Sequence, residues 1–381
     1  MSRLSQFVFW ISLAALLYVY VGYPLLLATI SLFCKKKRSR EFTPFLSILI
    51  AAYNEESGIR RKLEQTLQLD YPNDKFEIIV LSDGSTDRTD SIVESFGDSR
   101  IRLLRLTGRN GKTNAQNAGA KIARGDVIVF SDATTLYDSQ ALRRLASTYT
   151  EPQVGAASGR YLYFDPQEKS PTGLGTVAFW NYENVIKLLQ SKISTISGCC
   201  GCIYSVRREL YTPLEPDVIS DLVQPLHVIR QGYQVVFEDQ ALAYEETTQS
   251  TAEEFSMRVR VVTRGMRGLL SVPELLMPWR HAWISFQLWS HKILRWFVPI
   301  FLLTLLAANT MLWERPGYQF FLAIQIAFYA VAIVSLLVPL QRVWKPAGIP
   351  LYFCTLNAAA FLSLIEVVRG KKYVVWETVR T

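Results

Sequence analysis

The chain has few cysteines and histidines, and their spacing argues against a zinc centre. Its 381 residues include 5 cysteines and 3 histidines. Cys199, Cys200 and Cys202 fall within the short segment GCCGC, and no second Cys or His pair lies at a distance that suits zinc. We interpret these three as small packing residues, with Gly198 and Gly201 marking a tight loop where another group approaches the backbone.

Two common nucleotide-binding signatures are also missing. The chain has no GxxxxGK[ST] sequence, and no GxGxxG follows its first predicted strand, which excludes the usual ATP and dinucleotide fingerprints. Basic residues interleaved with aromatics do not occur before the arginines near position 260, so we expect no nucleic-acid partner.

Charge is missing over long stretches, which predicts membrane spans. Residues 7–33 contain no charged side chain, and a bilayer is crossed by about 20 apolar residues. Three further apolar stretches cover residues 293–312, 318–340 and 347–368. The first run continues into the basic cluster KKKRSR at 35–40 instead of a cleavage site, which favours a retained anchor. The positive-inside rule then places the following domain in the cytoplasm of a protein of the plasma or inner membrane.

The last apolar stretch leaves two alternatives open. Four crossings would place the C-terminus outside, whereas the tail RGKKYVVWETVRT is basic and predicts an inside location. Pro350, Asn357 and Glu366 lie within residues 347–368, so this segment crosses the membrane, or else dips into it or lies along its surface.

Between the anchors, apolar runs alternate with helical patterns. We predict strands at residues 45–52, 76–83, 101–106 and 127–130, and helices at 57–69, 86–96 and 114–123. Such alternation is typical of parallel βαβ units, whose strands are covered on both faces and read as continuous hydrophobic runs. The sequence therefore predicts an α/β domain.

Acidic residues follow three of these strands. AAYNEE carries Glu55, LSDGSTDRT carries Asp83, and VIVFSDATT carries Asp132. The carboxyl ends of parallel strands meet at one edge of a sheet, so we expect these acids to converge. The glycine-rich segment GRNGKTNAQNAG, with Lys112, opens a helix beside them. Backbone N–H groups and a cation suit a phosphate there, although Lys112 also fits a solvated lysine.

In order and spacing, ILIAAYNEE, LSDGSTDRT, GKTNAQNAGA, FSDATT and GCCGCIYSVRREL resemble the family 2 glycosyltransferases with a GT-A fold. The flanking membrane segments resemble the branch that includes the cellulose, hyaluronan and poly-N-acetylglucosamine synthases. The resemblance covers about residues 45–268. It implies a GT-A (Rossmann-like) mixed, mainly parallel sheet flanked by helices, with N-terminal and C-terminal transmembrane helices.

The resemblance also implies an activity. We expect an inverting, UDP-sugar-dependent hexosyltransferase that serves polysaccharide or glycoconjugate biosynthesis at the cytoplasmic membrane face. Its partners would be a UDP-sugar donor, a lipid-linked or glycan acceptor, and membrane lipid. The chain then divides into an N-terminal anchor with its basic flank (1–41), a cytoplasmic GT-A domain (42–278), and an interfacial helix with C-terminal spans and a basic tail (279–381).

The family's DxD motif, which holds a divalent metal, is only half present. Asp132 occupies its first position and Thr134 its second. A hydroxyl is a poor substitute for a carboxylate, so Mg²⁺ or Mn²⁺ would rely on Asp132, the diphosphate and water. The alternative is that Asp132 only caps a turn.

The remaining donor residues follow from the same resemblance. Asp83 resembles the acid that reads the uracil and ribose of UDP, with Tyr53, Asn54 and Glu55 lining the nucleoside pocket and Lys112 touching the diphosphate or the base. Asp87 fits either this site or a cap on the following helix.

On the acceptor side, Asp221 in PDVISDLVQPLHVIRQGY matches the family's catalytic base. A carboxylate near the reacting carbon suits the removal of a proton from the acceptor hydroxyl. Asp217 competes for this role, and a helix N-cap is the structural alternative for Asp221.

The processive synthases carry QxxRW in the next helix, and here that motif is lost. Its Gln, Arg and Trp positions hold Arg258, Val261 and Val262. This favours the addition of one or a few sugars, unless other aromatics, such as Tyr161, Tyr163 and Trp180, provide the platform.

Three arginines remain on one face of this helix, which we expect to open with a capping box at Thr251 and Glu254. Arg260, Arg264 and Arg267 lie at i, i+4 and i+7 and suit a diphosphate, or else anionic lipid.

Two other functions stay open: a processive polysaccharide synthase coupled to secretion, and a non-enzymatic polytopic scaffold or transporter.

Overall fold

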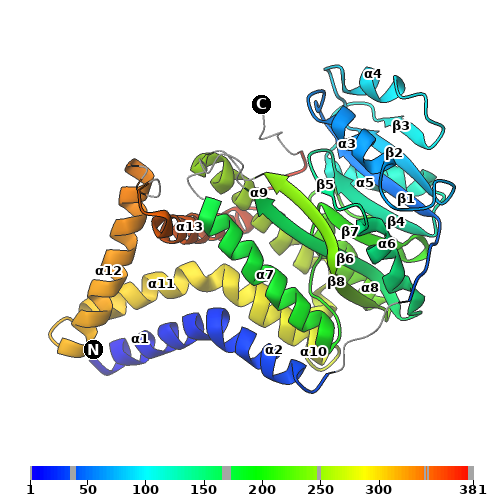
Figure 1. Cartoon of the computed structure of the whole chain (residues 1–381). Helices are drawn as coiled ribbons and strands as arrows, with labels where there is room; N and C mark the ends of the chain where they lie inside the picture. Colours follow the sequence, from blue (N-terminus) through cyan, green and yellow to red (C-terminus); the bar gives the residue numbers. More distant parts are fainter. Residues whose placement is uncertain are drawn as a thin grey trace.

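The computed structural model describes residues 2–34, 40–164, 173–246, 250–338, 340 and 343–375. A sheet domain lies beside a group of long apolar helices (Figure 1). Most of the predicted basic cluster at 35–40 and the end of the basic tail lie outside the described residues.

One eight-stranded sheet has the order β3-β2-β1-β4-β7-β6-β8-β5. Its strands are β1 (Leu46–Ala52), β2 (Phe76–Ser82), β3 (Ile101–Arg105), β4 (Val127–Asp132), β5 (Leu136–Tyr137), β6 (Val154–Phe164), β7 (Ile203–Arg207) and β8 (Gln234–Glu246). The first four strands pair in parallel, as predicted, while β7 runs antiparallel to both β4 and β6. The expected mixed, mainly parallel α/β sheet is confirmed for this first half and extended by a second half that the sequence patterns did not resolve.

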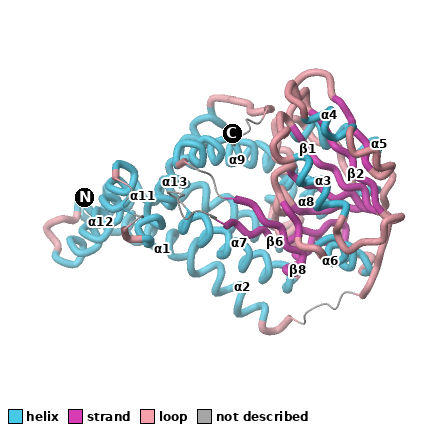
Figure 2. The backbone as a smooth tube through the Cα atoms, turned by 45° about the horizontal axis from the view of Figure 1, so that its top comes forward, coloured by secondary structure: helices cyan, strands magenta, loops and turns pink. Residues whose placement is uncertain are grey.

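Helices cover both faces of the sheet (Figure 2). One face carries α3 (Ile59–Leu67), α4 (Thr89–Glu94) and α6 (Ala141–Ser147), and the other carries α5 (Lys112–Ile122) and α8 (Ser220–Arg230). Alternate side chains of β1 explain this arrangement, because Ile48 and Ile50 join the first core and Leu49 joins the second. The predicted helices are confirmed, although α3 and α4 are shorter than their patterns indicated.

Two long helices connect the sheet to the apolar part: α7 (Gly173–Ile193) and α9 (Thr251–Leu270). The predicted capping box of α9 is wrong. The N-cap is Ser250, whose hydroxyl accepts a hydrogen bond from the Glu253 N–H at 3.2 Å. Thr251 is already the first helical residue, so the cap lies one position earlier than the pattern suggested.

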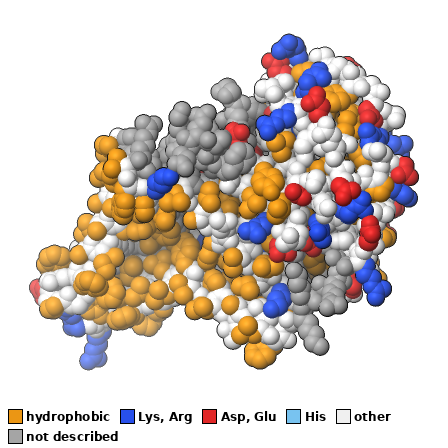
Figure 3. Space-filling model, viewed as in Figure 1, with side chains coloured by type: hydrophobic (Ala, Val, Ile, Leu, Met, Phe, Trp, Pro, Cys, Tyr) orange, Lys and Arg blue, Asp and Glu red, His pale blue; other side chains and the backbone are white. Residues whose placement is uncertain are grey.

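The apolar helices are α1 (Ser2–Leu17), α2 (Tyr23–Ser31), α10 (Ala282–Gln287), α11 (Leu294–Met311), α12 (Pro316–Leu337) and α13 (Gly348–Val368). Within the described residues they form four runs long and apolar enough to cross a membrane: Arg3–Ser31, Ala282–Met311, Pro316–Leu337 and Lys345–Val368. The helix expected to lie at the membrane surface after residue 278 is continuous with the second run, through a π-helical turn. Hydrophobic side chains dominate the visible surface of this part, whereas charged side chains are scattered over the sheet domain (Figure 3).

Candidate active site

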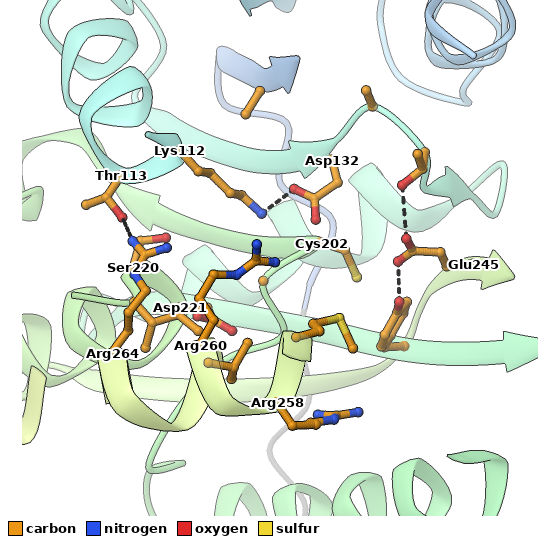
Figure 4. Close-up of a pocket in the computed structure, with 18 of the residues that line it drawn as sticks. Lys112, Thr113, Asp132, Cys202, Ser220, Asp221, Glu245, Arg258, Arg260 and Arg264 are labelled. Carbon is orange, nitrogen blue, oxygen red and sulfur yellow. Dashed lines mark hydrogen bonds and ion pairs between the residues drawn. The ribbon is translucent and has the colours of Figure 1, made fainter. Parts of the chain in front are cut away.

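A cavity of about 310 Å³ opens beyond the carboxyl ends of β1 and β4. Six of the predicted site residues line it: Glu55, Lys112, Asp132, Asp221, Arg260 and Arg264. Asp132 comes from the end of β4, Lys112 from the start of α5, Asp221 from α8, and the arginines from α9 (Figure 4). The convergence expected from the strand ends is therefore present. Tyr53, Asn54 and Asp83 are not part of this lining.

Asp132 and Lys112 form an ion pair across the cavity (Figure 4). Burial opposes the charge of Lys112, but the Asp132 carboxylate outweighs it and raises the pKa of the lysine. Two structural alternatives, that Asp132 only caps a turn and that Lys112 is a solvated lysine, are therefore wrong. The carboxylate of Asp132 binds Lys112 instead of capping a turn, and Lys112 is paired and mostly shielded from solvent, with 23% of its side chain exposed.

Asp83 holds the glycine-rich loop. Its buried carboxylate accepts hydrogen bonds from the backbone N–H groups of Asn110 and Gly111, both at 2.8 Å. Gly111 has φ of 92°, a conformation that favours glycine. These bonds set the position of Lys112, the next residue. The loop also carries Arg109, whose guanidinium lies 4.0 Å from the ring centroid of Tyr53.

Asn54 and Asp87 shape the turn after β1 and the start of α4. Among the residues that the structure describes, Asn54 is the non-glycine residue with a positive φ, which is 52°. Its side-chain oxygen accepts a hydrogen bond from the Thr86 N–H at 2.8 Å. Asp87 accepts from the Thr89 N–H and hydroxyl at 2.9 and 2.6 Å, at the first residue of α4. The capping prediction for Asp87 is wrong in position, because the N-cap of α4 is Arg88, without a side-chain cap, and Asp87 lies one residue before it.

Asp221 lies in the first turn of α8 and faces the cavity opposite Lys112. The N-cap of α8 is Ile219, without a side-chain cap, so the capping alternative for Asp221 is wrong. Gly201 makes room for the carboxylate, since a Cβ there would lie 3.0 Å from Asp221 Oδ2. The prediction of a close approach at Gly198 and Gly201 is thereby confirmed. Burial raises the pKa of Asp221, and Lys112 only partly opposes this.

The competitor, Asp217, is already paired. It binds Arg267 at 2.8 Å and Lys372 at 3.4 Å, and it does not line the cavity. Arg267 is thus held by Asp217 outside the cavity lining, although its spacing suggested that it would face phosphate with Arg260 and Arg264.

Arg264 is buried, which contradicts the alternative that this face of α9 rests on lipid. Its guanidinium donates to the Thr113 hydroxyl at 2.7 Å and to the carbonyl oxygens of Pro216 and Val218 at 3.2 and 2.5 Å. Burial lowers the pKa of Arg264 to about 10. Arg264 therefore ties α9 to α5 and to the segment before α8, beside the cavity.

Three aromatic side chains line or border the same cavity. Tyr161 lies 4.3 Å from Tyr163 and 5.2 Å from Trp180 between ring centroids, and Tyr163 lies 5.8 Å from Trp180. All three belong to the cavity lining. The residues suggested as a substitute platform for the lost tryptophan are therefore brought together by β6 and α7.

The sequence patterns missed two residues here, Lys62 and Glu245. Lys62 lies on α3, is 1% exposed, and donates to the Thr135 carbonyl oxygen at 2.6 Å. Burial lowers the pKa of Lys62 to about 7. Glu245, near the end of β8, lines the cavity and accepts from the Thr134 hydroxyl at 2.9 Å. Neither position carries a local signal, because a lysine in an amphipathic helix and a glutamate at a strand end are usually solvated.

A second cavity, also of about 310 Å³, lies among the apolar helices. Its lining includes Phe179 of α7, Trp296 of α11 and Tyr352 of α13, which make most of its surface apolar. Four ionisable side chains also line it: Glu183, His291, Lys292 and Arg295. Arg258 of α9 lines both cavities and is held by Glu254 at 2.7 Å and by the Tyr352 hydroxyl at 2.8 Å. The apolar cavity thus adjoins the polar one at a buried arginine.

Part of the chain matches a known protein family. Residues 47–213 match the model of glycosyl transferase family 2. The probable glycosyltransferase YdaM of Bacillus subtilis is 28% identical over 59% of this chain and 56% of its own length. The poly-beta-1,6-N-acetyl-D-glucosamine synthase of Staphylococcus epidermidis is 27% identical over 59% and 55%. The chain thus spans just over half the length of these curated relatives.

Among solved structures, the mannosyltransferase PcManGT of Pyrobaculum calidifontis, in complex with GDP-Man and Mn²⁺, superposes with a TM-score of 0.73. It is 22% identical, and the match covers 96% of this chain and 100% of that one. This likeness confirms the GT-A type of fold, including the apolar helices.

Proposed function

We propose that this chain, whose residues 47–213 form a glycosyl transferase family 2 domain, transfers a sugar from a UDP-sugar to a lipid-linked acceptor at the membrane surface. The observation that carries the proposal is the placement of Asp132, paired with Lys112, and of Asp221 opposite this pair in the lining of one cavity. An acid for the donor and an acid for the acceptor are what sugar transfer from a nucleotide requires.

On the donor side, Asp132 would hold a divalent metal, Mg²⁺ or Mn²⁺. The residues fit such an ion, because the Asp132 carboxylate already binds the positive charge of Lys112 within the cavity. When bound, the metal neutralises charge on the leaving diphosphate. Lys112 adds a second cation, and the loop held by Asp83 sets its position. Tyr53, Asn54 and Glu55, with Arg109 over the Tyr53 ring, form the proposed nucleoside end of the site.

On the acceptor side, Asp221 is the proposed base. Its raised pKa makes the carboxylate a stronger proton acceptor than an ordinary aspartate. The acceptor hydroxyl attacks the anomeric carbon as its proton passes to Asp221, and the bond to the diphosphate breaks. A single displacement of this kind inverts the anomeric configuration.

The apolar cavity supports a lipid-linked acceptor. Phe179, Trp296 and Tyr352 suit a hydrocarbon chain, and Arg258 at the junction suits the phosphate of a lipid phosphate. The aromatic group Tyr161, Tyr163 and Trp180 would then face the sugar side of the reaction. Four apolar runs suit an integral membrane protein, with a cytoplasmic domain at 42–278 between the anchors 1–41 and 279–381.

The test is nucleotide release by the purified full chain from a panel of UDP- and GDP-sugars, read as UDP from the former and GDP from the latter, with mass analysis of the product. Asp221→Asn should lower turnover by roughly 100- to 10,000-fold. Asp132→Ala should also abolish transfer, and it should weaken metal-dependent UDP affinity, whereas Asp221→Asn should leave that affinity unchanged. NMR of the product should show a β-linkage from an α-linked donor. Turnover without any nucleotide sugar requirement, or retention of configuration, would contradict the proposal.

A processive polysaccharide synthase is the second candidate. It is favoured by the aromatic group, which offers the stacking surface that Val261 and Val262 lack, and by the similarity to a poly-beta-1,6-N-acetyl-D-glucosamine synthase. Product length measured against the ratio of enzyme to acceptor separates the two. Long polymer made while most acceptor remains unextended would establish the synthase.

A further inference from the structure

The metal motif of this chain has a hydroxyl where a carboxylate is expected. Asp132 is followed by Ala133 and Thr134, so the second acid of DxD is missing. A neutral hydroxyl contributes no charge to balance a divalent cation, and Mg²⁺ or Mn²⁺ sites of this kind usually combine one or two carboxylates with substrate phosphates. A second acid near Thr134 would supply the missing charge.

Glu245 lies directly against Thr134. Its Oε1 accepts from the Thr134 hydroxyl at 2.9 Å, and its Oε2 accepts from the Thr135 hydroxyl at 3.5 Å and from the Tyr161 hydroxyl. Figure 4 shows Glu245 and Asp132 on the same side of the cavity, with Cys202 below and between them. Both acids belong to the cavity lining.

We infer that Glu245 supplies the second carboxylate of the metal site, in place of the acid missing at Thr134. The inference rests on the proposed function, since it assigns a residue to the metal of the same site. Thr134 then positions Glu245 through a hydrogen bond instead of binding the metal with a charge of its own.

The surroundings of Glu245 suit this role. Tyr161 and Thr135 fix the second oxygen, which leaves the carboxylate with a defined orientation. Buried Lys62 donates a hydrogen bond to the Thr135 carbonyl oxygen, so a second contact holds the turn that carries Thr134. Two carboxylates balance a divalent cation, and Lys112 can then leave Asp132 for the diphosphate.

A purely structural Glu245 is the competing explanation. In that case it only ties β8 to the turn after β4 through its hydrogen bonds. Glu245→Gln separates the two roles, because a glutamine oxygen still accepts from Thr134 but carries no charge. Glu246→Gln is the matched control: Glu246 is the next residue of β8 and lies outside the cavity lining.

The measurement is Mn²⁺ binding by the purified full chain in the presence of UDP, read by electron paramagnetic resonance. We expect Glu245→Gln to weaken Mn²⁺ binding by roughly 10- to 100-fold, Glu246→Gln to leave it unchanged, and thermal unfolding without metal to be nearly the same for both. The double variant Thr134→Asp with Glu245→Gln restores the acid at the motif and should recover most of the affinity.

The outcomes distinguish the inference from the proposed function. If Glu245→Gln binds Mn²⁺ and UDP like the unmodified chain while Asp132→Ala does not, Glu245 is structural and the inference is wrong, while the proposed function stands. If the unmodified chain binds UDP with no Mn²⁺ dependence, the metal role fails for Asp132 and Glu245 together. If it binds neither UDP nor GDP, the proposed function itself fails.

Discussion

Lys112 and Asp132 balance each other's charge within the cavity. The lysine neutralises the carboxylate that the metal would bind, and the carboxylate in turn raises the pKa of the lysine against the effect of burial. In the proposed function, metal and Lys112 would therefore compete for Asp132, while a diphosphate would attract both cations.

Lys112→Met should separate these effects. Without the lysine, Asp132 no longer has its ion-pair partner, so Mn²⁺ alone should bind more tightly. UDP should bind less tightly, because one cation facing the diphosphate is lost. Titration calorimetry with Mn²⁺ alone and then with UDP measures both. A parallel fall in the two affinities would contradict the competition.

The buried carboxylate of Asp221 should lower the stability of the folded chain in a way that depends on pH. Its pKa is raised by burial, so the folded chain binds this proton more tightly than the unfolded chain does. Below the ordinary aspartate pKa of about 3.9 both states are protonated. As pH rises from there through the raised pKa, the folded state must take up a buried charge, and stability falls.

Asp221→Asn should therefore be inactive but more stable than the unmodified chain at neutral pH. The difference between their melting temperatures should widen as pH rises through the raised pKa and shrink toward acid. Thermal unfolding across this pH range is the measurement. A variant that is less stable at neutral pH would mean that the attraction of Lys112 outweighs the cost of burial.

At the scale of elements, the loop before β7 and the first turn of α8 place the proposed base. Cys199 N–H donates to the Asp221 carbonyl oxygen at 2.8 Å, and the bare Cα of Gly201 lies against the Asp221 carboxylate. The GCCGC segment thus acts through its glycines and its backbone, while its buried cysteines pack in the two sheet cores.

Gly201→Ala should displace the Asp221 carboxylate by a few tenths of an ångström, because its Cβ would lie only 3.0 Å from Oδ2. Turnover should fall by roughly tenfold or more, since catalysis depends on precise placement, while UDP affinity stays unchanged. Gly232→Ala offers a contrast: no atom lies near its Cβ, so it tests backbone strain alone at φ of 90°. Equal turnover in Gly201→Ala and the unmodified chain would contradict this role of the loop.

At the scale of the whole molecule, α7, α9 and α13 bring the sheet domain and the apolar helices together. α13 packs on α9 and α7, and Arg258 joins the two cavities between them. In the proposed function, the lipid part of the acceptor lies on one side of this arginine and the reacting sugar on the other.

Filling the apolar cavity should therefore impair acceptor use alone. Ala178 of α7 lines this cavity, and Ala178→Phe should lower transfer to a lipid-linked acceptor by roughly tenfold or more. UDP affinity should not change. Ala330→Phe is the control, because it makes the same substitution at an exposed position of α12. If Ala178→Phe transfers to the lipid-linked acceptor at the normal rate, the acceptor does not use this cavity.

Local sequence patterns were sufficient for the first half of the sheet and for the residues at its edge. β1 and β4 are mainly apolar runs, and polar residues follow where each run ends, so Asp132 and Lys112 could be placed without tertiary information. The same holds for the four apolar runs, which depend on length and composition alone.

Tertiary structure decided the rest, because the partners are far apart in the chain. Glu245 meets Thr134 only once β8 has joined the sheet beyond β6, and Lys62 is buried only once the turn after β4 lies over α3. Arg264 and Arg267 share a helix face, yet they have different partners. Asp217 pairs with Arg267, whereas the backbone carbonyl oxygens just before α8 accept hydrogen bonds from Arg264. Helical periodicity specifies which side chains share a face, but which of them meets a ligand depends on the elements that pack against that face.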